Sequence, residues 1–245
     1  LAGIHYHLYA HQGGLTLQIS GLSEKQPILL ESLLEELKSF TYTEARFNLF
    51  RQQLTTHWRN TDSSKSISQL FSKLSSFMQP KNPTSEQLIS AMNQITFEEF
   101  IIFTRKIFEQ ISLSVFMHGN WHQKDASYVH QVIAEAFSGK YSNQFKAKIP
   151  TLNIHGRGNI KLPMLLPDHD HANVIYFPMD SKDLRTAALT MVTSQLLSPS
   201  FFQQMRTERQ FGYLVGVGFV PINRYPGIAF YIQSPKVDAL TLNNA

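Results

Sequence analysis

Cysteine is absent from the 245 residues of this sequence. Its absence excludes disulfide bonds, thiolate metal sites and a cysteine nucleophile. Charged residues are also scarce, at 16%, and no run of four lysines or arginines occurs, although the formal net charge is +4. Because the basic residues are scattered, we expect no nucleic-acid partner.

Long apolar runs are missing as well. No stretch approaches the length of a transmembrane helix, so we expect no membrane span. The first residues, Leu1 to Ile4, already resemble structured chain and contain no Met, and the last three carry no terminating pattern. We therefore expect a fragment of a longer polypeptide. With 42% hydrophobic residues and 18 Phe, a sizeable core is available, and disorder is not expected.

Hydrophobic periodicity predicts most of the secondary structure. Strands are expected where apolar and polar residues alternate, at 4–9, 15–21, 111–117, 154–160, 173–177, 214–220 and 228–233. Helices are expected where apolar residues recur every three or four positions, at 24–40, from 43, at 64–78, from 84, from 96, at 124–137 and at 184–197. Capping-box pairs mark three of the helix starts, namely Ser23 with Gln26, Thr84 with Gln87 and Thr96 with Glu99.

The order of these elements predicts an α+β fold rather than a doubly wound parallel sheet. A polar segment at 141–150, which ends at Pro150, reads as a linker. We therefore expect two α+β domains, 1–150 and 151–245, of which the second repeats the strand, helix, strand order of the first without completing it.

The stretch 201–220 carries the chemistry that we consider most informative. Its pattern predicts a helix that resumes after a break at Ser198 to Ser200 and ends at Gly212, followed by a packed strand. The turn between this helix and the strand brings Arg206 and Tyr213 to one corner. A guanidinium and a neutral phenol both donate hydrogen bonds, so the pair suits binding a peptide carbonyl or a developing oxyanion. The structural alternative is that Arg206 complements the dipole at a helix end and Tyr213 caps a core strand.

Three groups of residues have the composition of metal sites. They are the strand pair His5 and His7, the pair His118 and His122, and the tract from Asp168 to His171. We favour a structural role for each, since exposed strand histidines and solvated loops are common, and Gly119 and Asn120 break any helix between the second pair. No metal site is therefore predicted within this sequence.

Several separated segments resemble the last two domains of the pitrilysin and insulin-degrading family of zinc peptidases. The most specific is RTERQFGY at 206–213, followed by Leu214 and Val215, in which the Arg and Tyr positions match the family motif. The resemblance covers nearly the whole chain and includes three further segments, KQPILL at 25–30, HGN at 118–120 and YIQS at 231–234.

The resemblance implies two related α/β-layer domains of the pitrilysin-like metallopeptidase type, the second truncated. Residues 1–150 look like most of the third domain and 151–245 like the first part of the fourth, both non-catalytic. In this family, two bowl-like halves enclose a peptide chamber, and an inverted His-x-x-Glu-His motif in the first domain binds zinc. None of the ten histidines here has Glu three and His four residues on. Zinc would therefore lie in the missing N-terminal half of the same chain.

The same resemblance assigns roles to three residues. Arg206 would bind a backbone carbonyl of a peptide substrate near the scissile bond, Tyr213 would donate to that carbonyl or to the tetrahedral oxyanion, and Phe202 would line the pocket. No catalytic residue is expected here, and the fragment alone is predicted to be inactive. The resemblance to bacterial members of the family suggests that the protein is periplasmic.

Three functions stay open. The chain is half of a zinc endopeptidase, a non-catalytic peptide-binding subunit or inactive homologue, or a structural scaffold with no peptide site. The first two differ in whether the native polypeptide continues upstream with the zinc motif.

Overall fold

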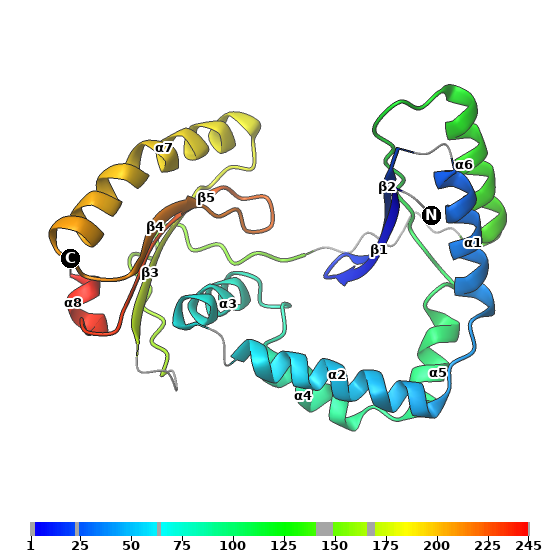
Figure 1. The fold of residues 1–245 in the computed structure, drawn as a ribbon, viewed down its shortest axis with the longest axis horizontal. Helices are drawn as coiled ribbons and strands as arrows, with labels where there is room; N and C mark the ends of the chain where they lie inside the picture. Colours follow the sequence, from blue (N-terminus) through cyan, green and yellow to red (C-terminus); the bar gives the residue numbers. More distant parts are fainter. Residues whose placement is uncertain (1–2, 23–24, 63–64, 141–148, 166–169, 245) are drawn as a thin grey trace. The chain divides into compact units, whose positions relative to one another are not determined.

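The structure is a computed structural model that describes residues 3–22, 25–62, 65–140, 149–165 and 170–244. It divides into two compact units, and Figure 1 gives the course of the chain through both. The first unit contains Leu1–Gln53 and Met92–Lys148, and the second contains Leu54–Ala91 and Ile149–Ala245. The last segment of the second unit begins at Ile149, within the linker expected at 141–150. However, residues 54–91 also join that unit, so the two-domain division at residue 150 stays a prediction.

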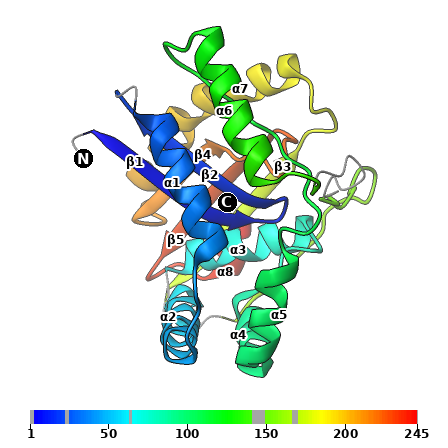
Figure 2. The ribbon, with the colours of Figure 1, turned by 90° about the vertical axis from the view of Figure 1, so that its right-hand side faces the viewer.

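The first unit is built on an antiparallel hairpin, as predicted. Strands β1 (Ile4–His11) and β2 (Gly14–Gly21) pair along their full length. Helix α1 (Gln26–Ser39) contacts β2 and α6 (Gln123–Ala136), and Figure 2 shows α1 in front of the hairpin. Leu34 of α1 and three residues of α6 form the buried cluster, namely Val129, Val132 and Ile133.

The remaining helices of the first half follow their sequence signals. The structure contains α2 (Glu44–Asp62), α3 (Ser66–Met78), α4 (Ser85–Gln94) and α5 (Phe97–Lys106). The capping boxes before α4 and α5 are both formed, with Gln87 N donating to Thr84 Oγ1 over 3.3 Å and Glu99 N to Thr96 Oγ1 over 3.2 Å. Ser23 lies outside the described residues, and the N-cap of α1 is Lys25.

Two predicted strands are not formed. Ile111 lies at an isolated β-bridge and its N–H donates to Lys140 O over 2.9 Å, but residues 112–117 do not form a strand. Residues 154–160 contain a turn at 155–157 instead of a strand. Alternation supplies strand propensity, but a strand forms only where another strand accepts its hydrogen bonds.

The second unit contains an antiparallel sheet in the order β3–β5–β4. Its strands are β3 (His171–Pro178), β4 (Leu214–Phe219) and β5 (Gly227–Ser234). Successive strand side chains point to opposite faces. Phe230 of β5 packs on Phe201 of α7 (Leu184–Phe202), with ring centroids 5.2 Å apart, whereas Tyr231 packs on Phe71 of α3, at 5.8 Å. Helices α7 and α3 therefore cover opposite faces of the sheet, as Figure 1 shows.

The predicted break at Pro199 is wrong, because α7 continues through it to Phe202. The N–H of Gln203 is shared between the carbonyls of Pro199 and Ser200. The helix then widens into a π-helical turn, η1 (Gln203–Glu208). Proline lacks an N–H and crowds the preceding turn. Turns of π-helix that interrupt α-helices occur frequently at functional sites.

Gly212 is not the helix C-cap, which corrects a second expectation. Gln210 takes the left-handed conformation, with φ 54°, and Phe211 N bonds to Met205 O over 2.8 Å, one residue further back than in a Schellman motif because the last turn is π-helical. Gly212 is required for a different reason. A Cβ at this position would lie 2.3 Å from the carbonyl oxygen of Gln233, so only glycine allows the turn to approach β5 this closely.

Candidate functional site

The three residues singled out by sequence lie at one corner of the second unit. Met205 is 6% exposed and belongs to the buried cluster with Val215, Ile232 and Leu242. Its burial anchors η1, and the next residue, Arg206, is exposed. Arg206 Nη1 donates to the carbonyl oxygen of Tyr213, and its guanidinium carbon lies 5.4 Å from the centre of the Phe202 ring.

The Arg206 contacts give this side chain a structural role as well. By binding the Tyr213 carbonyl it joins η1 to the start of β4, and the stack on Phe202 orients the guanidinium. Both aromatic side chains stay accessible, since Phe202 is 41% exposed and Tyr213 is 44% exposed. An accessible cation and phenol at one corner can meet a polar ligand from solvent.

The hydroxyl of Tyr213 enters a hydrogen-bond network with two residues that sequence reasoning did not select. It donates to Asp170 Oδ2 over 2.6 Å. The amide Nε2 of Gln233 donates to the same carboxylate oxygen over 2.9 Å and to the Tyr213 hydroxyl over 2.7 Å. The hydroxyl therefore sits between a carboxylate and an amide, while the guanidinium contacts the Tyr213 main chain.

Gln233 had a recognisable signal in the sequence. It lies in the apolar strand β5 and is 1% exposed, and a buried amide is costly unless it is hydrogen bonded. A glutamine within an apolar strand thus indicates a local polar network. Asp170 has no comparable signal in the sequence. It lies in the polar tract from Asp168 to His171, whose composition is that of possible metal ligands and does not indicate a hydrogen bond to a distant tyrosine.

The histidine groups do not form a metal site in the described part of the chain. His122 precedes α6, and its N–H bonds to Asp125 Oδ2 over 2.9 Å, so it does not share a helix face with His118. Asp168 and His169 lie outside the described residues. Among the residues that the structure does describe, no three His, Cys, Asp or Glu side chains gather closely enough to hold a metal. These residues therefore do not fit a zinc ion.

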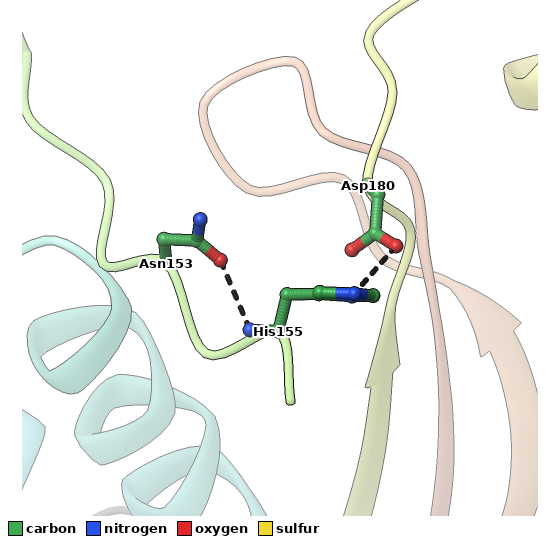
Figure 3. Close-up of polar contacts among 3 residues, drawn as sticks. All are labelled: Asn153, His155 and Asp180. Carbon is green, nitrogen blue, oxygen red and sulfur yellow. Dashed lines mark hydrogen bonds and ion pairs between the residues drawn. The ribbon is translucent and has the colours of Figure 1, made fainter. Parts of the chain in front are cut away.

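A second polar group lies elsewhere in the same unit. His155 Nδ1 is 2.9 Å from Asp180 Oδ2, and His155 N donates to Asn153 Oδ1 over 2.9 Å (Figure 3). These residues and Tyr176 border a cavity of about 320 Å³. The His155 and Asp180 side chains are 73% and 70% exposed, and such surface pairs contribute little to stability. Burial raises the pKa of Tyr176 to about 12.

Solved structures with the same fold are known. The crystal structure of pitrilysin matches with a TM-score of 0.75 at 18% identity, over 96% of this chain and 25% of pitrilysin. A structure described as the peptidase M16 inactive domain from Pseudomonas fluorescens matches with a TM-score of 0.59 at 14% identity, over 94% of this chain and 57% of that one. The chain therefore has the α+β fold of the pitrilysin-like peptidases.

Sequence comparisons identify the family and the part of it. Residues 1–91 match the middle or third domain of peptidase M16, and residues 192–245 match the family described as PQQ synthase PqqF-like, C-terminal lobe domain 4. Human insulin-degrading enzyme is 24% identical over 249 residues, covering 96% of this chain and 24% of that enzyme. A putative zinc protease of Schizosaccharomyces pombe is 22% identical, covering 96% of this chain and 25% of that protein.

The chain belongs to the pitrilysin and insulin-degrading (M16) peptidase family, and it corresponds to the C-terminal region of its members. It spans about a quarter of the length of the curated relatives that it matches, 24% for the human enzyme. Within the described residues, no helix is both long enough and apolar enough to cross a membrane.

Proposed function

We propose that this chain is the substrate-binding C-terminal half of a zinc metalloendopeptidase that hydrolyses peptides in an enclosed chamber. The observation that carries the proposal is the accessible corner where Arg206 contacts both the Phe202 ring and the Tyr213 main chain. The side chains of Arg206 and Tyr213 can both donate hydrogen bonds. The corner therefore suits binding a peptide and stabilising charge.

Each residue has one role in this proposal. The Arg206 guanidinium binds a substrate carbonyl near the scissile bond, and one face of the Phe202 ring lines the pocket beside that bond. The Tyr213 hydroxyl donates a hydrogen bond to the carbonyl oxygen or to the tetrahedral oxyanion. The metal and the water that it activates belong to the rest of the polypeptide. The partners are a peptide substrate and that remaining part, and the 245 residues alone are inactive.

One observation favours a second candidate, a non-catalytic peptide-binding homologue. The related structure from Pseudomonas fluorescens is described as an inactive domain. The two candidates differ in whether the upstream part of the polypeptide carries the inverted zinc motif. They also differ in whether peptide hydrolysis is seen and is lost with a chelator. A periplasmic location rests only on the resemblance to bacterial members.

The decisive experiment is a peptidase assay of the full-length polypeptide. Tyr213→Phe removes one oxyanion donor, so we expect kcat to fall by about a hundredfold, which corresponds to about 3 kcal/mol of barrier. Tyr128→Phe is the matched control, because Tyr128 is 41% exposed and also donates to a carboxylate, Glu31 Oε2, over 3.1 Å.

The outcomes separate the candidates. A chelator should abolish hydrolysis by the full-length protein, and the 245-residue chain assayed beside it should show none. If Tyr213→Phe kept the wild-type kcat, or lowered kcat no more than Tyr128→Phe does, the proposed role of the phenol would be wrong. A full-length protein that bound peptides without hydrolysing them would favour the second candidate.

A further inference from the structure

The orientation of the Gln233 side-chain amide is fixed by its neighbours. The backbone N–H of Ile67, in the first turn of α3, is 3.2 Å from Gln233 Oε1. A backbone N–H can only donate, so the oxygen of the amide must face it. The Nε2 group then faces Tyr213 and Asp170, with one N–H for each.

This orientation sets the direction of the next hydrogen bond. The Tyr213 oxygen accepts from Gln233, so its own proton points to Asp170 Oδ2, 2.6 Å away. The series runs from the Ile67 N–H through Gln233 and Tyr213 to Asp170. Ser66 Oγ, next to Ile67, also donates to the main-chain oxygen of Asp170 over 3.3 Å. The phenol is thus tied to the first turn of α3, within the second unit.

We propose that Asp170 and Gln233 are positioning residues for Tyr213. Their two hydrogen bonds hold the phenol oxygen at a fixed place while part of the ring stays exposed. When a substrate carbonyl arrives, the hydroxyl turns about its C–O bond from Asp170 to the substrate, and the oxygen keeps its bond from Gln233. The ring need not move, so the donor is already in place before the substrate binds. This inference rests on the proposed function of Tyr213.

The distribution of burial supports a positioning role. Gln233 is 1% exposed, whereas Tyr213 is 44% exposed. A buried amide is costly, and here both of its N–H groups serve a partly exposed phenol and its carboxylate. A buried amide thus holds the phenol oxygen of a residue that is itself partly exposed.

A double-mutant cycle in the full-length polypeptide tests the inference with peptide hydrolysis as the readout. Asp170→Ala should lower kcat by about tenfold or more with a smaller change in KM, because the phenol loses one of its two supports. Asp170→Asn retains an acceptor oxygen and should restore most of the rate. In a Tyr213→Phe background, Asp170→Ala should change kcat by less than about twofold, because no hydroxyl is left to position.

Gln233→Glu provides a second route if Asp170→Ala fails to fold. Gln233→Glu keeps an acceptor oxygen for Ile67 N but replaces the N–H donor that faces the phenol. The substitution should therefore lower kcat in the otherwise wild-type protein and leave kcat unchanged in the Tyr213→Phe background. Equal losses in both backgrounds, or no loss in the wild type, would overturn the positioning role. The proposed function fails separately, if Tyr213→Phe alone keeps the wild-type kcat.

Discussion

Replacing Gly212 by alanine tests the close approach of the turn at Gly212 to strand β5, which sets the position of the candidate site. The new Cβ would lie 2.3 Å from Gln233 O, 2.9 Å from Ile232 Cγ2 and 3.1 Å from Gln233 C. Two of these atoms are main chain and cannot turn aside, so the turn and β5 must separate by about an ångström. Overpacking of this kind costs about 1–3 kcal/mol.

The separation would also affect a neighbouring hydrogen bond. Tyr213 N donates to the same Gln233 oxygen over 3.1 Å, and losing this bond adds about 1 kcal/mol. The total of about 2–4 kcal/mol leaves a domain of ordinary stability folded. The displaced phenol should lower the kcat of the full-length protein as well, since an error of about 1 Å in position costs up to a hundredfold.

The assay is urea unfolding of the 245-residue chain, followed by fluorescence. Of the two tryptophans, Trp58 lies in the second unit and Trp121 in the first, so a Trp121→Phe background reports on the second unit alone. Gly218→Ala is the matched control, because a Cβ there meets nothing within 4 Å. If Gly212→Ala lost no more stability than Gly218→Ala, the reasoning from close approach would be refuted.

Two further predictions concern stability. Because burial raises the pKa of Tyr176 to about 12 from about 10 in the unfolded chain, the folded state holds its proton more tightly, and stability should fall as pH rises from 10 to 12. The loss is at most about 2 kcal/mol after allowance for solvent screening. In Tyr176→Phe the free energy of unfolding should fall less steeply between pH 10 and 12 than in the wild type. The same slope in both proteins would contradict this prediction. Thr96→Ala removes the cap of α5 and should cost about 1 kcal/mol in urea unfolding, which Thr96→Ser should largely restore; equal losses in both variants would contradict the capping role.

Local signals in the sequence predicted much of the fold. The β1–β2 hairpin and the starts of α4 and α5 depend on residues only a few positions apart, and all of them form as expected. The two strands expected at 111–117 and 154–160 failed because a strand also needs a distant partner, which periodicity does not reveal. The grouping of residues 54–91 with the C-terminal segment is equally non-local.

The candidate site was predicted in part. A resemblance between short motifs selected Arg206, Tyr213 and Phe202, and the structure brings the three to one corner, but their role in binding a substrate stays a prediction. Gly212 was predicted to end the helix, but the structure requires it because of its close approach to β5. In a sequence, a glycine required by a tertiary contact cannot be told from a glycine at a helix C-cap. Asp170 was not selected because its partner lies 43 residues away along the chain.

The central proposal is that this chain binds the main chain of a peptide substrate through Arg206. The most direct measurement is the Kd of an unstructured peptide for the full-length protein in the presence of a chelator. Arg206→Gln should raise Kd by about tenfold or more, since a hydrogen bond to a charged group contributes about 1.5–3 kcal/mol. Arg209→Gln is the matched control, because Arg209 also lies over an aromatic ring, 5.6 Å from the centre of Phe211, and it should leave Kd within about twofold. Equal Kd values for the wild type and Arg206→Gln would contradict the account.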